Sequence, residues 1–216
     1  MTEIECDNLD ETIEKYEQLG YRLDMIRPAD SPREALMSTS VETVRLVLSP
    51  GFSRQKPPEG GTQNRWTKGR AGMEYRALSP RYGRSLDHAV PPEGGTQNAD
   101  LIVSHIRLTQ DGEVPDYVHY HKVNFQMIRC IKGRIKVVYE DQGEPFWLEP
   151  GDWVIQPPQI RHRVLYSEGN AEVIEISMPA EHETWIDHDL ELPTNEFSPD
   201  RDFSGQRFVR FVARDS

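Results

Sequence analysis

The chain has 216 residues, of which 36 are acidic and 25 are lysine or arginine, so its formal net charge at pH 7 is −11. This excess of negative charge argues against a nucleic-acid partner, because phosphates require a basic protein face. No stretch approaches the roughly 18 apolar residues that span a membrane, so no membrane partner is expected either.

Residues 1–50 begin without the basic segment and apolar run of a signal peptide, so we expect a cytoplasmic protein. A helix is predicted near the start of this region. It begins at Asp10, a plausible N-cap, and Gly20 ends it. Its apolar residues recur at three-residue spacing: Ile13, Tyr16 and Leu19.

Strands follow the predicted helix. Alternating patterns indicate strands at 21–26 and 44–48, and a weaker one at 36–37. This order resembles one βαβββ half-module of the vicinal oxygen chelate (glyoxalase-like) group, which pairs such modules to form a metal cup. Residues 1–50 hold one module and no histidine. We therefore interpret them as a structural or dimerisation domain, with metal binding there as the alternative.

Residues 51–98 are rich in glycine, proline and arginine, and they carry an identical octet twice. The sequence Pro-Pro-Glu-Gly-Gly-Thr-Gln-Asn stands at 57–64 and again at 91–98. The flanking residues do not repeat, whereas structural repeats keep their hydrophobic spacing and drift in sequence. We interpret this region as an irregular connector in which a copied element occupies surface loops. A ligand-cradling glycine loop is the alternative, but such loops stand between a strand and a helix.

Between the octets, residues 69–78 mix basic and aromatic side chains and could lead into the edge of a barrel. An arginine of this segment could bind a substrate carboxylate, because the planar guanidinium matches that group bidentately. The alternative, which we favour, is a strand whose Arg70 and Arg76 offset an acidic surface.

Residues 99–180 contain seven short alternating segments separated by turns rich in glycine, proline and aspartate. This pattern predicts a mainly β fold, an antiparallel sandwich or a small jelly-roll barrel. Cys130 lies in one of the segments, where a buried free thiol is expected. The predicted strands are 102–108, 125–131, 134–139, 146–148, 153–155, 163–166 and 172–177.

Two sequence motifs in this region predict a metal site. His119 and His121 are one residue apart, so on a strand they point the same way. The side chain of Gln126 can converge on the same point, and a third histidine, His162, follows a later turn. Three imidazoles and an amide oxygen suit a divalent transition metal such as Fe, Mn, Ni, Cu or Zn.

Both stretches resemble the two conserved motifs of the cupin superfamily, and the resemblance covers about residues 99–180. Gln126 stands where the family motif has glutamate, which removes one negative charge from the ligand set. Gln159 stands at a turn glycine, and the first spacer differs by one residue. The resemblance implies a cupin jelly-roll barrel with a metal centre. The matching positions are Gly112, His119, His121, Gln126 and Gly133 in the first motif, and Gly151, Pro157, Gln159 and His162 in the second.

A metal with neutral ligands keeps its full charge, which strengthens it as a Lewis acid. We expect a metal-dependent enzyme that acts on a small anionic oxygenated substrate, with dioxygenase-type chemistry favoured. Three alternatives stay open. They are a non-oxidative isomerase or lyase acting on sugar acids, a non-catalytic cupin that binds a small molecule, and an oligomer in which the metal serves stability alone.

Residues that flank the ligands are candidates for catalysis. Tyr166 follows His162 by four residues on the same predicted strand and should point with it, and Arg161 precedes that histidine directly. Tyr120, between two histidines, should point away from them. Glu175 is a candidate to hold one imidazole in its tautomer.

The C-terminal extension, residues 181–216, holds His182 and His188. A zincin motif needs two histidines four residues apart on a helix, and these are six apart. We expect this extension to form a lid or a dimer contact beside the barrel, and the whole chain to form a homodimer.

Overall fold

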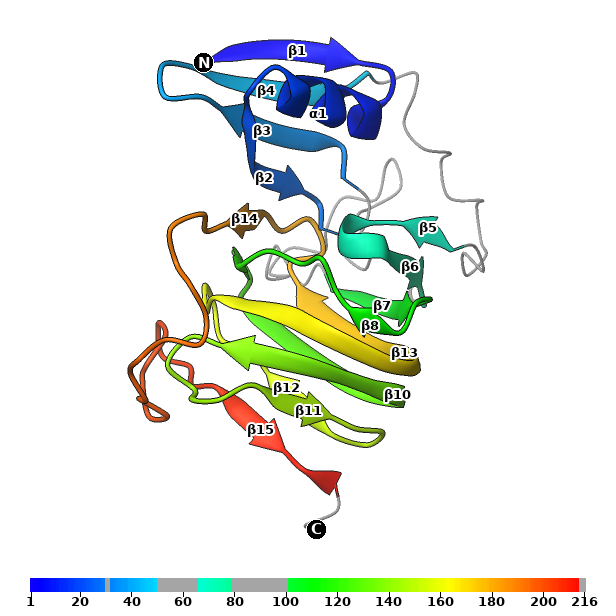
Figure 1. Cartoon of the computed structure of the whole chain (residues 1–216), viewed down its shortest axis with the longest axis vertical. Helices are drawn as coiled ribbons and strands as arrows, with labels where there is room; N and C mark the ends of the chain where they lie inside the picture. The colour runs from blue at the N-terminus through cyan, green and yellow to red at the C-terminus, as the bar shows by residue number, and fades with distance from the viewer. Residues whose placement is uncertain (30–31, 50–65, 79–100, 214–216) are drawn as a thin grey trace, which may run out of the picture.

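The computed structural model describes residues 1–29, 32–49, 66–78 and 101–213 (Figure 1). Both copies of the octet lie outside the described residues. Over the described residues, 15 strands form one continuous hydrogen-bonded sheet that curls into a barrel at its C-terminal part. The described part is mainly β, as the sequence predicted.

The N-terminal module consists of β1 (Thr2–Cys6), α1 (Leu9–Gln18), β2 (Arg22–Arg27), β3 (Glu34–Ser38) and β4 (Thr43–Leu48). Its strand order is β1-β4-β3-β2, with β1 parallel to β4 and the other pairs antiparallel. Elements therefore follow the βαβββ order that the sequence indicated.

Helix α1 begins at an N-cap that differs from the predicted one. The side-chain oxygen of Asn8, not that of Asp10, accepts a hydrogen bond from the backbone amide of Glu11 at 3.3 Å. Ile13 and Tyr16 pack against the buried apolar residues of the module's own strands. The module thus has a core of its own.

One half of the barrel is formed by β14 (Thr184–Ile186), β9 (His119–His121), the first part of β13 (His162–Met178), the last part of β10 (Phe125–Tyr139) and β11 (Phe146–Leu148). The short strand β8, residues 112–113, also pairs with β13.

The other half is formed by β6 (Met73–Ala77), β7 (Ile102–Leu108), the remaining parts of β13 and β10, β12 (Trp153–Ile155) and β15 (Val209–Phe211). β5 (Thr67–Lys68) pairs with β6. Buried apolar side chains of the two halves form one cluster, so the core lies between them.

Two pairs of predicted strands are each one long strand. Segments 125–131 and 134–139 join in β10, and 163–166 and 172–177 join in β13, because both strands bend from one half of the barrel into the other. The β10–β13 register shifts between Cys130 and Arg134. There Gly133 has a φ of +60°, which residues other than glycine rarely adopt.

The C-terminal extension joins the module to the barrel. β14 lies beside β2 (Figure 1). It pairs with β2 on one side, Trp185 opposite Met25, and with β9 on the other, Trp185 opposite Tyr120. The expectation of a lid or dimer contact is therefore wrong for this segment, which is an internal strand of the sheet.

The segment expected to be an irregular connector contains part of the barrel. β6 pairs with β7, and its Met73 and Tyr75 belong to the barrel core. Cys130 is a buried free thiol, as predicted. Across the described residues, the helices are too short or too polar to cross a membrane.

Candidate metal centre

Three buried histidines meet inside the barrel. His119 and His121 lie on β9, and His162, at the start of β13, is the cross-strand partner of His119. Their ring centroids are 4.3–5.2 Å apart, and one nitrogen atom of each lies within 4.8 Å of the others. The three predicted histidines are thus brought together.

The protein fixes each ring through its Nδ1 atom. His119 Nδ1 donates to the carbonyl oxygen of Tyr117 at 2.8 Å, and His162 Nδ1 donates to that of Ile160 at 2.9 Å. A carbonyl oxygen can only accept, so Nε2 of both rings carries the lone pair. His121 Nδ1 lies 2.8 Å from Thr184 Oγ1 on β14.

A divalent metal fits this arrangement. His119 Nε2 is buried and has no hydrogen-bond partner among the described residues, which is costly unless another group meets its lone pair. Burial lowers the pKa of His162 to about 3. Burial is also the main cause that lowers the pKa values of His119 and His121 well below the ordinary value, and Arg70 and the neighbouring imidazoles add to it. The imidazoles are therefore neutral at pH 7, as metal ligation requires.

Gln126 lies on β10 with 1% of its surface exposed. It shares a strand face with Ile128, which lines the barrel cavity, because residues two apart point the same way. Its Nε2 atom has no hydrogen-bond partner within the described residues. Gln126 therefore faces the interior of the barrel.

The barrel encloses a cavity of about 40 Å³ whose wall combines these histidines with apolar and charged side chains. His121 and His162 form part of that wall, together with Tyr139, Arg70 and Glu175. The volume is enough for a few water-sized groups.

Arg70 supplies a buried cation to the cavity. Its side chain is 12% exposed, and its Nη1 pairs with Asp116, whose side chain is fully buried. Asp116 in turn accepts hydrogen bonds from the backbone amides of Tyr117 at 3.1 Å and Val164 at 2.9 Å. The expectation that Arg70 offsets an acidic surface is therefore wrong, because the turn between β5 and β6 directs it inward.

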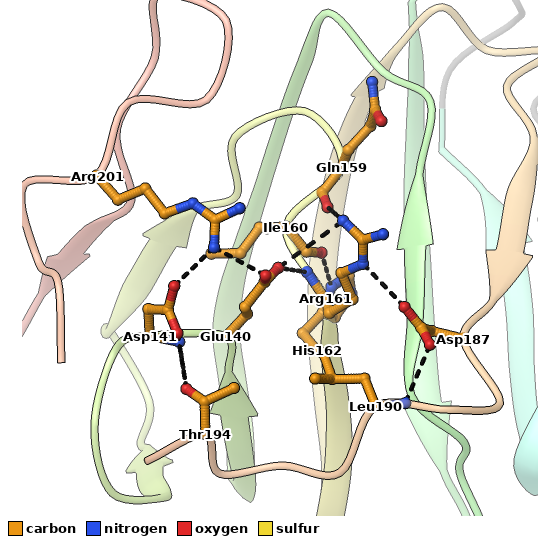
Figure 2. A network of polar contacts seen from close by, with 10 residues as sticks. All are labelled: Glu140, Asp141, Gln159, Ile160, Arg161, His162, Asp187, Leu190, Thr194 and Arg201. Atoms are coloured by element: carbon orange, nitrogen blue, oxygen red, sulfur yellow. Dashed lines mark hydrogen bonds and ion pairs between the residues drawn. The ribbon is translucent and has the colours of Figure 1, made fainter. Parts of the chain in front are cut away.

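Arg161 is not among the residues that line the cavity, and Figure 2 shows its guanidinium between Glu140 and Asp187. Its Nε donates to Asp187 Oδ2 at 3.1 Å, and its Nη1 lies 4.0 Å from Glu140 Oε2 and 3.3 Å from the carbonyl oxygen of Gln159. Two carboxylates thus hold the guanidinium outside the barrel wall. A catalytic role for Arg161 stays a prediction, and these contacts show which groups hold its guanidinium.

Tyr166 also faces outward, with 37% of its surface exposed and its ring edge-on to Trp147. The β10–β13 register shifts between Lys136 and Val137, so β13 has one extra residue between Val164 and Tyr166. That bulge reverses the alternation. The expectation that Tyr166 points with His162 is therefore wrong.

The groups that hold the histidine rings were not identified from the sequence. Glu175, the predicted partner, lines the cavity and accepts a hydrogen bond from Ser177 Oγ at 3.1 Å, and its contact with an imidazole stays a prediction. Thr184 was missed, because the sequence does not show that β14 pairs with β9, and only that pairing places Thr184 opposite His121. Asp116, whose Oδ1 lies 3.8 Å from His119 Nδ1, was missed as well, since it lies in a loop without a repeating pattern.

Comparisons with known proteins agree with the two motifs. Residues 105–177 match the sequence model of the family described as "Cupin domain", which confirms the predicted resemblance. A search of the curated proteins finds no match.

Solved structures resemble just over half of the chain. KdgF from Halomonas is 19% identical, with a TM-score of 0.37 over 53% of this chain and 87% of that one. An RmlC-like cupin from Shewanella frigidimarina is 19% identical, with a TM-score of 0.39 over 58% and 92%. A salicylate 1,2-dioxygenase mutant from Pseudoaminobacter salicylatoxidans, solved with gentisate, is 19% identical, with a TM-score of 0.37 over 55% and 30%.

Proposed function

Because residues 105–177 carry a cupin domain, we propose that this protein is a metal-dependent cupin enzyme with His119, His121, His162 and Gln126 as ligands. The observation that carries the proposal is the trio of buried imidazoles, two of which have Nδ1 bound to a carbonyl oxygen and Nε2 left as a lone pair. The third ring, that of His121, is held through Nδ1 by Thr184 Oγ1, so all three rings are organised before any ion arrives.

Bound iron or copper would supply oxygen chemistry at these ligands, and manganese, nickel or zinc would supply Lewis-acid chemistry. The chain contributes a neutral ligand set, because the pKa values of the three histidines are lowered by burial. It also excludes bulk water, since the histidines are at most 6% exposed.

We propose a small anionic oxygenated substrate. The cavity of about 40 Å³ favours a compact molecule. Arg70 supports an anionic one, because a guanidinium has five N–H donors and Asp116 contacts one of its terminal nitrogens. The remaining donors can bind a carboxylate or enolate oxygen.

Dioxygenase-type chemistry is the favoured reaction, and a non-oxidative isomerase or lyase is the second candidate. Glu175 favours the second, because a carboxylate in the cavity wall can accept a proton from one position of a substrate and return it to another. Such a transfer needs no oxygen.

Metal analysis of the purified protein tests the proposal. Wild type should retain about one divalent transition metal per chain, whereas His121→Ala and His162→Ala should lose most of it. His188→Ala removes a histidine that contacts the backbone of Leu23, and it serves as the control. Full retention in both cavity variants would refute the metal site.

Oxygen uptake with diketones, phenolic acids and sugar acids then separates the two reactions. Iron or copper with oxygen consumption supports a dioxygenase. Manganese, nickel or zinc with isomerised product and no oxygen consumption supports the non-oxidative enzyme.

A further inference from the structure

Gln156 is a buried side chain with unmet hydrogen-bonding capacity. It follows β12, it is 0% exposed, and neither Nε2 nor Oε1 has a hydrogen-bond partner within the described residues. Burying an amide without partners is unfavourable, whereas leucine would fill a similar volume at no such cost. A ligand that meets both amide atoms would account for the glutamine.

Gln156 and Gln126 are neighbours on the inner face of the barrel. The β10–β12 ladder pairs Met127 with Ile155, and the backbone amide of Gln156 donates to the carbonyl oxygen of Gln126 at 2.9 Å. The two glutamines are therefore the next cross-strand pair, and their side chains lie on one face. That face is the inner one, because Val154, two residues before Gln156, belongs to the core.

His182 lies between the end of β13 and the start of β14, and the loop that follows Gln156 contacts β9, where the backbone amide of Gln159 donates to the carbonyl oxygen of His121 at 3.1 Å. It is 3% exposed, and its ring stands edge-on to His121 with centroids 5.2 Å apart. Its Nδ1 donates to the carbonyl oxygen of Pro179 at 2.9 Å, so Nε2 carries a lone pair. That Nε2 is buried and has no hydrogen-bond partner in the part of the chain that the structure describes.

These groups offer both donors and acceptors. The donors are Gln156 Nε2 and Gln126 Nε2, the latter when Gln126 Oε1 faces the metal. The acceptors are Gln156 Oε1 and His182 Nε2. A simple carboxylate can only accept, so it leaves the two acceptors unmet. A ligand with a hydroxyl group beside a carboxylate or carbonyl oxygen meets both kinds.

We propose that Gln156, Gln126 and His182 form a polar subsite that binds the hydroxyl-bearing part of a 2-hydroxy acid or enediol beside the three histidines. The proposal rests on the proposed function and narrows its substrate class. It assigns Gln156 and His182 to ligand binding, distinct from the metal ligands.

Glycolate and acetate provide the test, because they differ by one hydroxyl group. Calorimetric titration is made on the protein as purified and on protein stripped by chelation, with metal content measured on each sample. Wild type should bind glycolate at least 10-fold more tightly than acetate in both forms. Gln156→Leu should reduce that preference to less than 2-fold while leaving acetate affinity and metal content unchanged.

Two further variants complete the design. Gln110→Leu makes the same substitution at an exposed position and should leave the preference intact. His182→Phe keeps an aromatic ring without the Nε2 acceptor and should lower glycolate affinity more than acetate affinity.

An unchanged preference in Gln156→Leu, or no preference in wild type, would overturn the subsite even if metal is bound. Wild type without metal, but with a Gln156-dependent preference, would overturn the metal enzyme and leave the subsite standing. A Gln156→Leu protein that is more stable and binds both probes as wild type does would show that ordered water alone meets the glutamine.

Discussion

At each histidine of the centre, one ring nitrogen is held by the protein and the ring itself is buried. The cost of this arrangement is that a proton cannot be accommodated, since burial is the main cause of the lowered pKa values of His119, His121 and His162. The metal-free protein should therefore be sensitive to acid.

We predict that the metal-free protein loses stability as the pH falls from about 6.5 toward 3. The ordinary pKa is 6.5 and that of folded His162 is about 3, so within this window the unfolded chain binds a proton that the folded chain does not. Between pH 6.5 and pH 5 the loss contributed by His162 reaches up to about 2 kcal/mol.

Urea unfolding at a series of pH values measures this loss. His162→Gln removes one titrating group and should show a shallower dependence than wild type. Equal slopes for the two proteins would contradict the prediction.

The amide at position 126 sets the charge of the proposed ligand set. Gln126→Glu adds a negative charge in a buried position, where charges interact more strongly than in water. We predict tighter metal binding and weaker binding of an anionic chelating ligand, each by about 10-fold, as for a 1.4 kcal/mol change.

Chelator competition and titration with oxalate measure the two affinities. Gln159→Glu, at an exposed position, is the matched control. Unchanged oxalate binding in Gln126→Glu would show that the charge argument is wrong.

At the scale of single elements, β14 orients a residue of the centre through one hydroxyl group. Thr184→Val keeps the shape of the side chain but removes the hydrogen-bond partner of His121 Nδ1. We predict that metal affinity falls roughly 10- to 100-fold, as is typical when such a supporting hydrogen bond is removed. Thr184→Ser retains the hydroxyl and should bind metal much as wild type does. Equal affinities in all three proteins would exclude a role for this bond.

The bend of β10 depends on Gly133. An added Cβ would collide with the backbone carbonyl oxygen of Glu168, and the φ of +60° is unfavourable for alanine. We predict that Gly133→Ala lowers the free energy of unfolding by roughly 2–4 kcal/mol. Gly205→Ala has a similar φ of +85° but meets no atom within 4 Å, so it should cost about 1 kcal/mol. Equal losses in denaturant unfolding would show that the collision is relieved.

The period-two alternation and the spacing of His119 and His121 are local, and they predicted most strands and the meeting of the histidines. Features that depend on distant partners were not predictable. The bulge that turns Tyr166 outward appears only in the register between β10 and β13. Burial of Arg70 depends on Asp116, and the role of Thr184 depends on β9.

At the scale of the whole molecule, the N-terminal module does not need another chain to cover its helix. Ile13 and Tyr16 pack on the module's own strands, and Leu19, the third residue of the predicted apolar face, is 65% exposed. Large exposed apolar residues elsewhere in the described part, such as Val41 and Phe197, are far apart in the sequence.

The homodimer stays a prediction, and the barrel is now the part of the chain on which we expect the subunit interface. We expect light scattering at micromolar concentration to give twice the chain mass of 24.9 kDa. Leu19→Ser tests the module as an interface, because it removes an exposed apolar side chain from α1. We expect the dimer to survive this substitution. A monomeric wild type would rule the homodimer out.

The order of synthesis gives β14 one more consequence. On the ribosome the N-terminal module is made first. The edge of β2 that later pairs with β14 therefore has no partner while the barrel strands are synthesised. One edge of β9 also stays unpaired until the same three residues, Thr184–Ile186, leave the ribosome and pair with it. Unpaired edges invite association with other chains. A nascent chain that stalls before β14 therefore exposes two edges, and the release of one short strand closes both.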